Sequence, residues 1–285
     1  MNSLEHVTRD RVGSAVGSLR TVIIDVQLSQ ANSTWAQYLE GVVAAQEAGF
    51  NTVWALDHLS GVSFDGRTML ECFTVLGAMA AATTTIGLGS LVVNAANRHP
   101  GMLATAAASV QSISGGRFVL GLGAGTSPTS RFAREQDVLG IAIAPRMADR
   151  HRHLCDTLDV LEEMWSPARD PEKWEGFALP HPAPPVILGV NSTRLATIAG
   201  QRTNGVNVRA HNTDRREVIA AAREARSANP RPWTTSVWCS WDDALLDPSH
   251  PLRVELEADG VDRLILSWFA PVDASVIARA GGVNR

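Results

Sequence analysis

The sequence contains very little of several residue types on which some protein classes depend. Lysine occurs once, at Lys173, so arginine supplies nearly all the positive charge, and the formal net charge is −4. A negative net charge without a dense Lys/Arg run argues against nucleic acid as a partner. The three cysteines, Cys72, Cys155 and Cys239, lie far apart and form no CxxC motif. This spacing argues against a zinc site or a disulfide framework, so we expect no metal and a reduced, cytoplasmic setting.

Long apolar segments are also missing. Residues 1–20 are charged and lack the apolar core of a signal peptide, and we expect them to form a loose extension. No run of 18 apolar residues occurs, so the sequence predicts no membrane span. With 285 residues, of which 45% are hydrophobic, the chain can bury a sizeable core. We expect residues 21–285 to form one domain.

The stretch from Thr85 to Thr126 has the most informative pattern. Two apolar runs, Ile86–Val93 and Phe118–Leu122, flank an Ala-rich segment. That segment opens at Arg98–Pro100, where proline fits the first turn of a helix. It closes at Gly115–Gly116, a typical helix stop. The pattern predicts a βαβ unit with two parallel strands.

The remainder of the chain repeats this alternation. Short apolar or β-branched runs predict strands at Thr21–Leu28, Asn51–Leu56, Ile86–Val93, Phe118–Leu122, Val186–Val190, Gly205–Arg209, Thr234–Cys239 and Arg263–Trp268. Helices are predicted over Ser33–Ala48, Thr68–Ala82, the Ala-rich segment, Met147–Trp165, the segment after Asn191, Thr213–Ser227, Pro251–Asp259 and Val272–Ala280. Eight strand–helix pairs predict an α/β fold of the (β/α)8 (TIM) barrel type, and a doubly wound sheet is the alternative.

In such a barrel the active site lies at the carboxyl ends of the strands. That rule selects Asp57–His58 after the second strand, Val93–Asn94 at the end of the third, Gly123–Thr126 after the fourth and Gly189–Thr193 after the fifth. Each of these positions holds glycine or polar residues. We therefore predict that they converge on one site.

Glycines alternate along the end of the fourth predicted strand, at Gly121, Gly123 and Gly125. Because side chains alternate across a strand, these glycines strip one face of its side chains, and a flat ring or a phosphate can then approach the backbone. A tight strand-to-helix turn that needs glycine is the alternative. Residues 121–126 lack the sixth-position glycine of a dinucleotide-binding motif, which argues against a Rossmann interpretation.

Taken together, the motifs resemble those of the bacterial luciferase-like flavin and deazaflavin oxidoreductases over residues 20–270. The stretches that carry the resemblance are Val53–Leu59, Ile86–Ser90, Val92, Asn94, Arg98–Pro100, Ile113–Arg117, Gly121–Gly125, Pro145–Met147, Trp165, Pro185–Gly189 and Asn204–Gly205. The resemblance implies a barrel enzyme that transfers a hydride to or from a small-molecule substrate, and a homodimer. Asp57–His58 and Arg98–Pro100 resemble the branch that uses coenzyme F420, a deazaflavin.

The resemblance also implies a site. In the family, a bulge in the third strand contains a cis non-prolyl peptide that supports the cofactor ring, and here it corresponds to Leu91–Val92. His58 would donate a proton or hydrogen bond near the hydride-accepting carbon, and Asp57 would hydrogen-bond the polar edge of the ring. The other implied cofactor-binding residues are Asn94, Gly123, Gly125, Thr126, Gly189, Asn191, Ser192 and Thr193.

Several of these residues have a structural alternative. Asp57 would cap a loop with His58 packed beneath it, Leu91–Val92 would belong to a plain buried strand, and Asn191–Thr193 would cap a helix. For His99, beside a proline, a structural cap is the favoured interpretation.

One position departs from the family pattern. Thr126 stands where some deazaflavin-dependent sugar-phosphate dehydrogenases have a catalytic glutamate, and Glu135, nearby in sequence, cannot be placed from the sequence alone. The substrate pocket is expected between residues 126–134, the Pro-rich loop 166–185 and the ends of the last two strands, where Trp238, Trp241 and Trp268 are candidates. Two further functions stay open: an FMN-dependent monooxygenase that uses oxygen, and a barrel that binds a ligand without catalysis.

Overall fold

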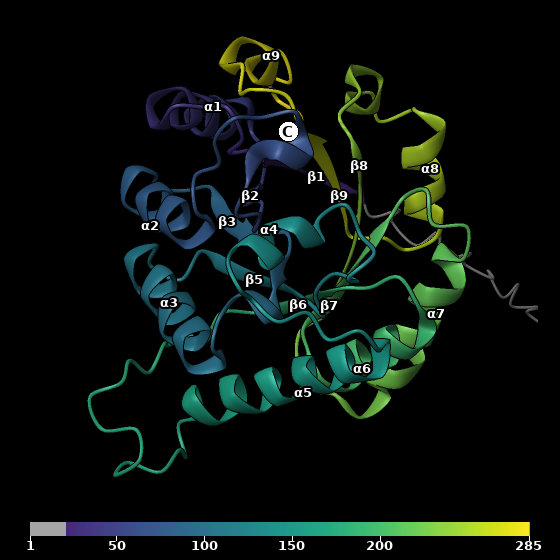
Figure 1. Ribbon diagram of the computed structural model, residues 1–285. Coiled ribbons are helices and arrows are strands. Elements are labelled where there is room, and N and C mark those ends of the chain that lie inside the picture. The colour runs from purple at the N-terminus through teal and green to yellow at the C-terminus, as the bar shows by residue number, and fades with distance from the viewer. Residues whose placement is uncertain (1–20, 285) are drawn as a thin grey trace, which may run out of the picture.

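The computed structural model describes residues 21–284, so the extension predicted at residues 1–20 lies outside the described residues. Parallel strands form a closed barrel with helices around it (Figure 1). β1 pairs with both β2 and β9, and β5 pairs with β3, β4 and β6, so the sheet has no edge at these strands. The predicted (β/α)8 barrel is confirmed, and the doubly wound alternative, which needs an open sheet, is wrong.

The predicted strands agree with the observed ones within a few residues, except that the third is divided in two. The strands are β1 (Ile23–Leu28), β2 (Thr52–Ala55), β3 (Gly87–Ser90), β4 (Val93–Asn94), β5 (Phe118–Gly123), β6 (Val186–Gly189), β7 (Gly205–Arg209), β8 (Thr234–Ser240) and β9 (Arg263–Trp268). The helices are α1 (Trp35–Ala48), α2 (Cys72–Ala82), α3 (Pro100–Ile113), α4 (Ala133–Val138), α5 (Met147–Met164), α6 (Thr193–Arg202), α7 (Arg215–Ala225), α8 (Pro251–Ala258) and α9 (Ala274–Ala278). Short 3-10 helices are η1 (Gly61–Phe64), η2 (Ala95–Asn97), η3 (Arg226–Ala228) and η4 (Asp243–Leu246).

Local signals in the sequence set the ends of α3. The His99 Nδ1 accepts a hydrogen bond from the backbone N–H of Gly101, and Pro100 occupies the first turn. At the other end Gly115 and Gly116 both have positive φ, +64° and +90°, which glycine adopts without steric cost. The structural interpretation of His99 as a cap is therefore confirmed.

Apolar side chains fill two regions, one between the barrel and its helices and one inside the barrel. The inner cluster is built on Trp54, Leu91, Ile187 and Ile265. Asp25 is also buried and receives hydrogen bonds from Trp54 Nε1 and from Arg263 at 3.1 Å. Burial raises the pKa of Asp25, and the charge of Arg263 opposes that rise.

A bulge interrupts the third barrel strand between β3 and β4. Leu88 pairs with Phe118 and Val93 pairs with Leu122, so four residues of the third strand face three residues of β5. One extra residue in one of two paired strands is the definition of a β-bulge. The peptide bond Leu91–Val92 within it is cis. The bulge and the position of its cis bond are as predicted.

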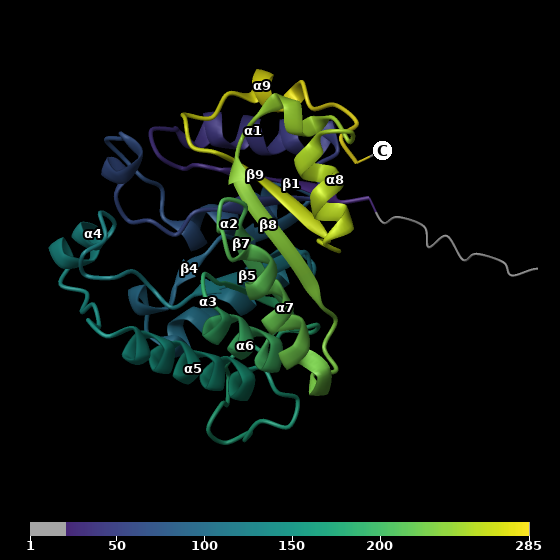
Figure 2. The same cartoon turned by 90° about the vertical axis from the view of Figure 1, so that its right-hand side faces the viewer.

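The Pro-rich segment 166–185 contains no helix or strand among the described residues, as predicted for a loop. It connects the end of α5 to the start of β6, and helices of a (β/α)8 barrel run opposite to its strands, so this loop lies at the amino ends of the strands. In Figures 1 and 2 it lies at the bottom, apart from α4. The prediction that this loop forms a wall of the substrate pocket is therefore wrong.

No helix within residues 21–284 combines the length and the apolar character needed to cross a membrane. In the same part of the chain, no cluster of three or more His, Cys, Asp or Glu side chains is arranged to hold a metal ion.

Candidate active site

A cavity of about 1490 Å³ opens at the carboxyl ends of the strands. The predicted site residues that line it are Asp57, His58, Leu91, Val92, Asn94, Gly123, Gly125, Thr126, Gly189 and Asn191. Two other predicted site residues, Ser192 and Thr193, are not among the described residues that line the cavity. Ser192 is the N-cap of α6, where its side chain accepts a hydrogen bond from Leu195 N at 3.4 Å. For Ser192 the structure shows the capping alternative, whereas Thr193 is the first residue of α6.

The alternating glycines make room for the bulge. A Cβ at Gly121 would collide with the carbonyl oxygen of Ser90. A Cβ at Gly123 would lie 2.9 Å from the Val92 side chain, and one at Gly189 would lie 3.0 Å from it. The side chain of Val92 thus fills much of the space that these glycines leave. The glycines admit a protein segment into the barrel mouth, and the bulge in turn forms the cavity wall.

Buried polar groups hold the bulge in place. The Ser90 hydroxyl donates to the Gly121 carbonyl at 3.0 Å and accepts from the Gly121 N–H at 3.1 Å. The Gln27 amide donates to the Leu91 carbonyl at 2.6 Å, and its oxygen accepts from the Ser267 hydroxyl at 2.7 Å. Gln27, Ser90 and Ser267 are all buried. Unpaired groups at this depth would be costly, so the pairing favours one geometry of the bulge.

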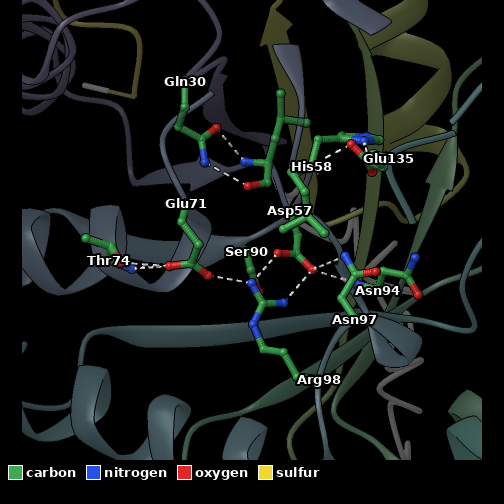
Figure 3. A network of polar contacts seen from close by, with 12 residues as sticks. Gln30, Asp57, His58, Glu71, Thr74, Ser90, Asn94, Asn97, Arg98 and Glu135 are labelled. Carbon is green, nitrogen blue, oxygen red and sulfur yellow. Dashed lines mark hydrogen bonds and ion pairs between the residues drawn. The ribbon is translucent and has the colours of Figure 1, made fainter. Parts of the chain in front are cut away.

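Asp57 is the centre of a network at the end of β2 (Figure 3). Its carboxylate accepts two hydrogen bonds from the Arg98 guanidinium, at 2.7 and 2.8 Å, and one from the backbone N–H of Asn94 at 2.9 Å. The Asn97 amide approaches the same carboxylate at 3.5 Å. The Asp57 side chain is fully buried. The carboxylate thus fixes the loop after β4 and faces protein donors, which differs from the predicted role at the edge of a cofactor ring.

Arg98 lies between two carboxylates, because its Nη2 also donates to Glu71 Oε1 at 2.5 Å. Burial lowers the pKa of Arg98, but its contacts with Asp57 and Glu71 outweigh burial and raise that pKa above its usual value. Glu71 is the N-cap of α2 and accepts from Thr74 N at 2.7 Å. Arg98 therefore links α2, β2 and the start of α3 as a permanently charged group.

His58 pairs with Glu135 of α4 at the end of β2 (Figure 3). The His58 Nδ1 lies 2.9 Å from Glu135 Oε1, while Glu135 Oε2 accepts the backbone N–H groups of Leu59 and Ser60 at 2.9 and 3.1 Å. The exposed fractions of the side chains are 22% for His58 and 6% for Glu135. Burial raises the pKa of Glu135, but the hydrogen bonds from His58, Leu59 and Ser60 outweigh it and lower the pKa.

Aromatic side chains form the wall around His58. Its ring has centroid distances of 4.9 Å to Phe64 and 4.8 Å to Phe132. Phe64 also stacks on Phe269, which meets Trp238 edge to face. The structure thus confirms that Trp238 lines the cavity, as do the ends of β8 and β9.

The other two candidate tryptophans lie elsewhere. Trp241 and Trp268 meet edge to face at a centroid distance of 5.9 Å and pack against the core between barrel and helices. Their assignment to the pocket is wrong, because Trp268 alternates with the inward-facing Ser267 and points to the opposite side of β9.

The cavity wall also contains basic and amide groups. Among them are His151 and Arg150 of α5 and Asn191. The Nδ1 atom of His151 is buried and has no hydrogen-bond partner among the described residues. Burial, followed by the charges of Arg194 and Arg150, lowers the pKa of His151. A buried polar atom without a partner at a cavity wall is a group on which a ligand can act.

Sequence reasoning did not place three groups of this site. Glu135 lies in the short helix α4, between the predicted strand that ends at Leu122 and the predicted helix that begins at Met147, where no periodic apolar pattern indicates a helix. Arg98 was recognised as part of a motif, but its ion pair with Asp57 depends on how β2 and β4 are brought together. Gln27 lies in the predicted strand Thr21–Leu28, and its alternation with the apolar Val26 and Leu28 puts it on the other face of that strand, inside the barrel.

The closed parallel barrel, its cavity at the carboxyl ends and its bulged third strand define an α/β-barrel protein of the luciferase-like type. The chain matches the family of luciferase-like monooxygenases over residues 16–243 and belongs to that family.

Comparisons with individual proteins agree with this. The chain is 30% identical over 172 residues to the F420-dependent glucose-6-phosphate dehydrogenase of Nakamurella multipartita, covering 57% of this chain and 49% of that enzyme. It is 24% identical over 266 residues to the F420-dependent hydroxymycolic acid dehydrogenase of Mycobacterium tuberculosis, covering 82% of this chain and 71% of that enzyme. The first match thus spans about half the length of the relative.

Solved structures show the same fold. An F420-dependent secondary alcohol dehydrogenase, in complex with an F420–acetone adduct, superimposes with a TM-score of 0.73 at 14% identity over 93% of this chain and 99% of that one. The F420-dependent tetrahydromethanopterin reductase of Methanopyrus kandleri gives 0.65 at 16% identity over 92% and 97%.

Proposed function

We propose that this protein is an oxidoreductase that transfers a hydride between coenzyme F420 and a small organic substrate. The observation that supports it most is that one cavity brings together the bulge at Leu91–Val92 and the partly exposed His58. Hydride transfer needs a ring with one face held by protein and a proton donor or acceptor near the other. The relatives that are named as F420-dependent support the choice of cofactor.

The cavity fits such a cofactor in size and chemistry. Its volume of about 1490 Å³ exceeds the roughly 300–1,000 Å³ of ordinary ligand pockets and leaves room for a cofactor and a substrate. The bulge and Gly123 offer a smooth wall to a flat ring. In the same wall, the unpartnered Nδ1 of His151, together with Arg150 and Asn191, suits the phosphate-bearing tail.

Each residue then has a defined task. When bound, the deazaflavin supplies a hydride to the substrate or accepts one from it. Gln27 fixes the Leu91 carbonyl, so the bulge supports one face of the ring without moving. Asp57 holds the backbone of Asn94, which keeps the Asn94 side chain at the cavity wall. His58 gives a proton to the substrate or removes one, depending on the direction of the reaction.

The wall near His58 favours an apolar, flat substrate. Phe64, Phe132, Trp238 and Phe269 present aromatic surface there, and aromatic rings bind planar groups better than hydrated sugars. An activated alkene or imine in the reducing direction fits, as does a hydrophobic alcohol in the oxidising one. In thermal-shift assays with F420 present, we expect stabilisation by cyclohexenone and none by glucose 6-phosphate. The reverse order would contradict this substrate class.

The proposal extends to location and assembly. The three cysteines are free, which is consistent with the reduced environment of the cytoplasm. The family resemblance supports a homodimer. Light scattering of the purified protein should give twice the chain mass of 30.5 kDa, and a monomer at micromolar concentration would contradict the dimer.

The test is a parallel calorimetric titration of the purified protein with F420 and with FMN. We expect F420 to bind with micromolar affinity and FMN more weakly. His151→Leu should weaken F420 binding by about ten- to a hundredfold, since a hydrogen bond to a charged group contributes on the order of 1.5–3 kcal/mol. Lys173→Ala, in the loop at the opposite end of the barrel, is the control and should bind as the wild type does.

Two results would overturn the proposal. Tighter binding of FMN, followed by oxygen uptake with the reduced flavin, would identify a monooxygenase. Binding of neither cofactor would favour a barrel without catalysis.

A further inference from the structure

We propose that Glu135 is a positioning residue that sets the orientation and the protonated nitrogen of His58. The inference rests on the proposed function, in which His58 exchanges a proton with the substrate. The sequence motifs assign no role to Glu135, which lies in α4, the helix that follows β5.

The contacts of Glu135 are arranged for this task. One carboxylate oxygen meets His58 Nδ1 at 2.9 Å, and the other accepts the N–H groups of Leu59 and Ser60. The same carboxylate therefore fixes both the imidazole and the backbone that follows it. The rings of Phe64 and Phe132 contact the imidazole as well. The ring is thus held by one polar contact and two aromatic contacts.

The chemistry of a carboxylate decides which nitrogen carries the proton. An ionised carboxylate only accepts hydrogen bonds, so His58 Nδ1 must be the protonated nitrogen in the neutral ring. Nε2 is left with its lone pair, and no hydrogen bond to Nε2 occurs within the described residues. Since His58 lines the cavity, Nε2 is the atom available to a substrate.

This arrangement gives a balanced proton transfer. In alcohol oxidation, the O–H bond breaks and its proton goes to Nε2, while the C–H bond breaks and its electron pair leaves as hydride for the oxidised deazaflavin. The oxygen electron pair then forms the carbonyl. In the reverse reaction, the protonated imidazole returns the proton from Nε2 while Nδ1–H stays on Glu135.

Other carboxylates at the cavity wall are less suited to the role. The wall contains Asp57, Asp65 and Glu135 among the described residues. Asp57 is occupied by Arg98 and the loop after β4. Asp65 is exposed at the end of η1. Thr126, the other candidate position for an acid, has no titratable group. Glu135 is thus the carboxylate in contact with His58.

The test is ¹⁵N NMR of the histidine side chains in the protein without cofactor, with the His58 signals assigned by their loss in His58→Gln. We expect neutral His58 in the wild type to be almost wholly the Nδ1–H tautomer. In Glu135→Gln the population should shift to a mixture of both tautomers. Asp137→Asn, an exposed carboxylate of the same helix, is the matched control and should leave the spectrum of His58 unchanged.

The outcomes separate the inference from the function on which it rests. A wild-type His58 with its proton on Nε2 would overturn the role of Glu135 before any variant is made. An unchanged tautomer in a folded Glu135→Gln protein would do the same. If F420 does not bind to the wild type, the proposed function fails, whereas the tautomer result stands as measured.

Discussion

Asp57 shows how a residue at the mouth of a barrel can hold neighbouring segments together. Its buried carboxylate receives three close hydrogen bonds, two of them from one guanidinium. Each end of the contact is therefore charged and largely removed from water. Breaking a buried ion pair leaves an uncompensated charge, which is more costly than replacing both partners.

We expect Asp57→Asn to lower the free energy of unfolding by about 3 kcal/mol, which is the low end of the range for breaking a buried ion pair. The low end applies because Arg98 keeps its contact with Glu71. Urea denaturation measures the change. Asp65→Asn is the control, since this exposed residue has a positive φ of 54° that asparagine tolerates. A loss below about 0.5 kcal/mol in Asp57→Asn, within the range of ordinary surface changes, would contradict the network.

Glu135 should make stability depend on pH in a defined direction. The pKa of Glu135 is lower in the folded chain than its ordinary value of 4.5. The ionised carboxylate therefore adds its full contribution to the free energy of unfolding above pH 4.5, and this contribution is lost as the pH falls through the folded pKa. Glu135→Gln should therefore cost about 1.5–3 kcal/mol at pH 7, as loss of hydrogen bonds to a charged group does. The cost should shrink below pH 4.5. A cost that is constant from pH 7 to pH 3 in urea titrations would contradict this.

Among the elements, the third barrel strand departs most from its predicted form. The apolar run from Ile86 to Val93 predicts one continuous strand. An apolar run indicates which residues are buried, but it does not indicate how they pair with the residues of β5. The bulge depends on groups from other strands, namely Gln27, the Gly121 backbone and the space at Gly123 and Gly189. The family resemblance placed the bulge, whereas hydrophobic periodicity alone does not.

The same substitution should have opposite effects in two elements. Gly121→Ala in β5 should destabilise by about 2–3 kcal/mol, the upper range for overpacking, because the new methyl group meets the Ser90 carbonyl. Gly77→Ala in α2 meets no atom within 4 Å and should stabilise by about 0.5–1 kcal/mol. Thermal and urea unfolding of both variants test this. Equal effects would mean that the glycines of β5 are not needed for the bulge.

For the whole molecule, the alternation of strands and helices was sufficient to predict the barrel, because eight short apolar runs alternate with eight helical segments along the chain. It was sufficient also to place most site residues, since the carboxyl ends of the strands converge by geometry. It did not place the loop 166–185 correctly, although the direction of α5 determines its side. Glu135 required the path of the irregular segment between β5 and α5, which no local pattern encodes.

We expect F420 to bind at the carboxyl ends of the strands, against the bulge. Hydrogen–deuterium exchange with and without F420 tests it most directly, and the segment 166–185 at the opposite end is an internal control. If F420 binds there, exchange should slow at residues 91–94, 123–126 and 189–191, with no change at 166–185. Unchanged exchange in those three segments at saturating F420, or protection confined to other parts of the chain, would contradict it.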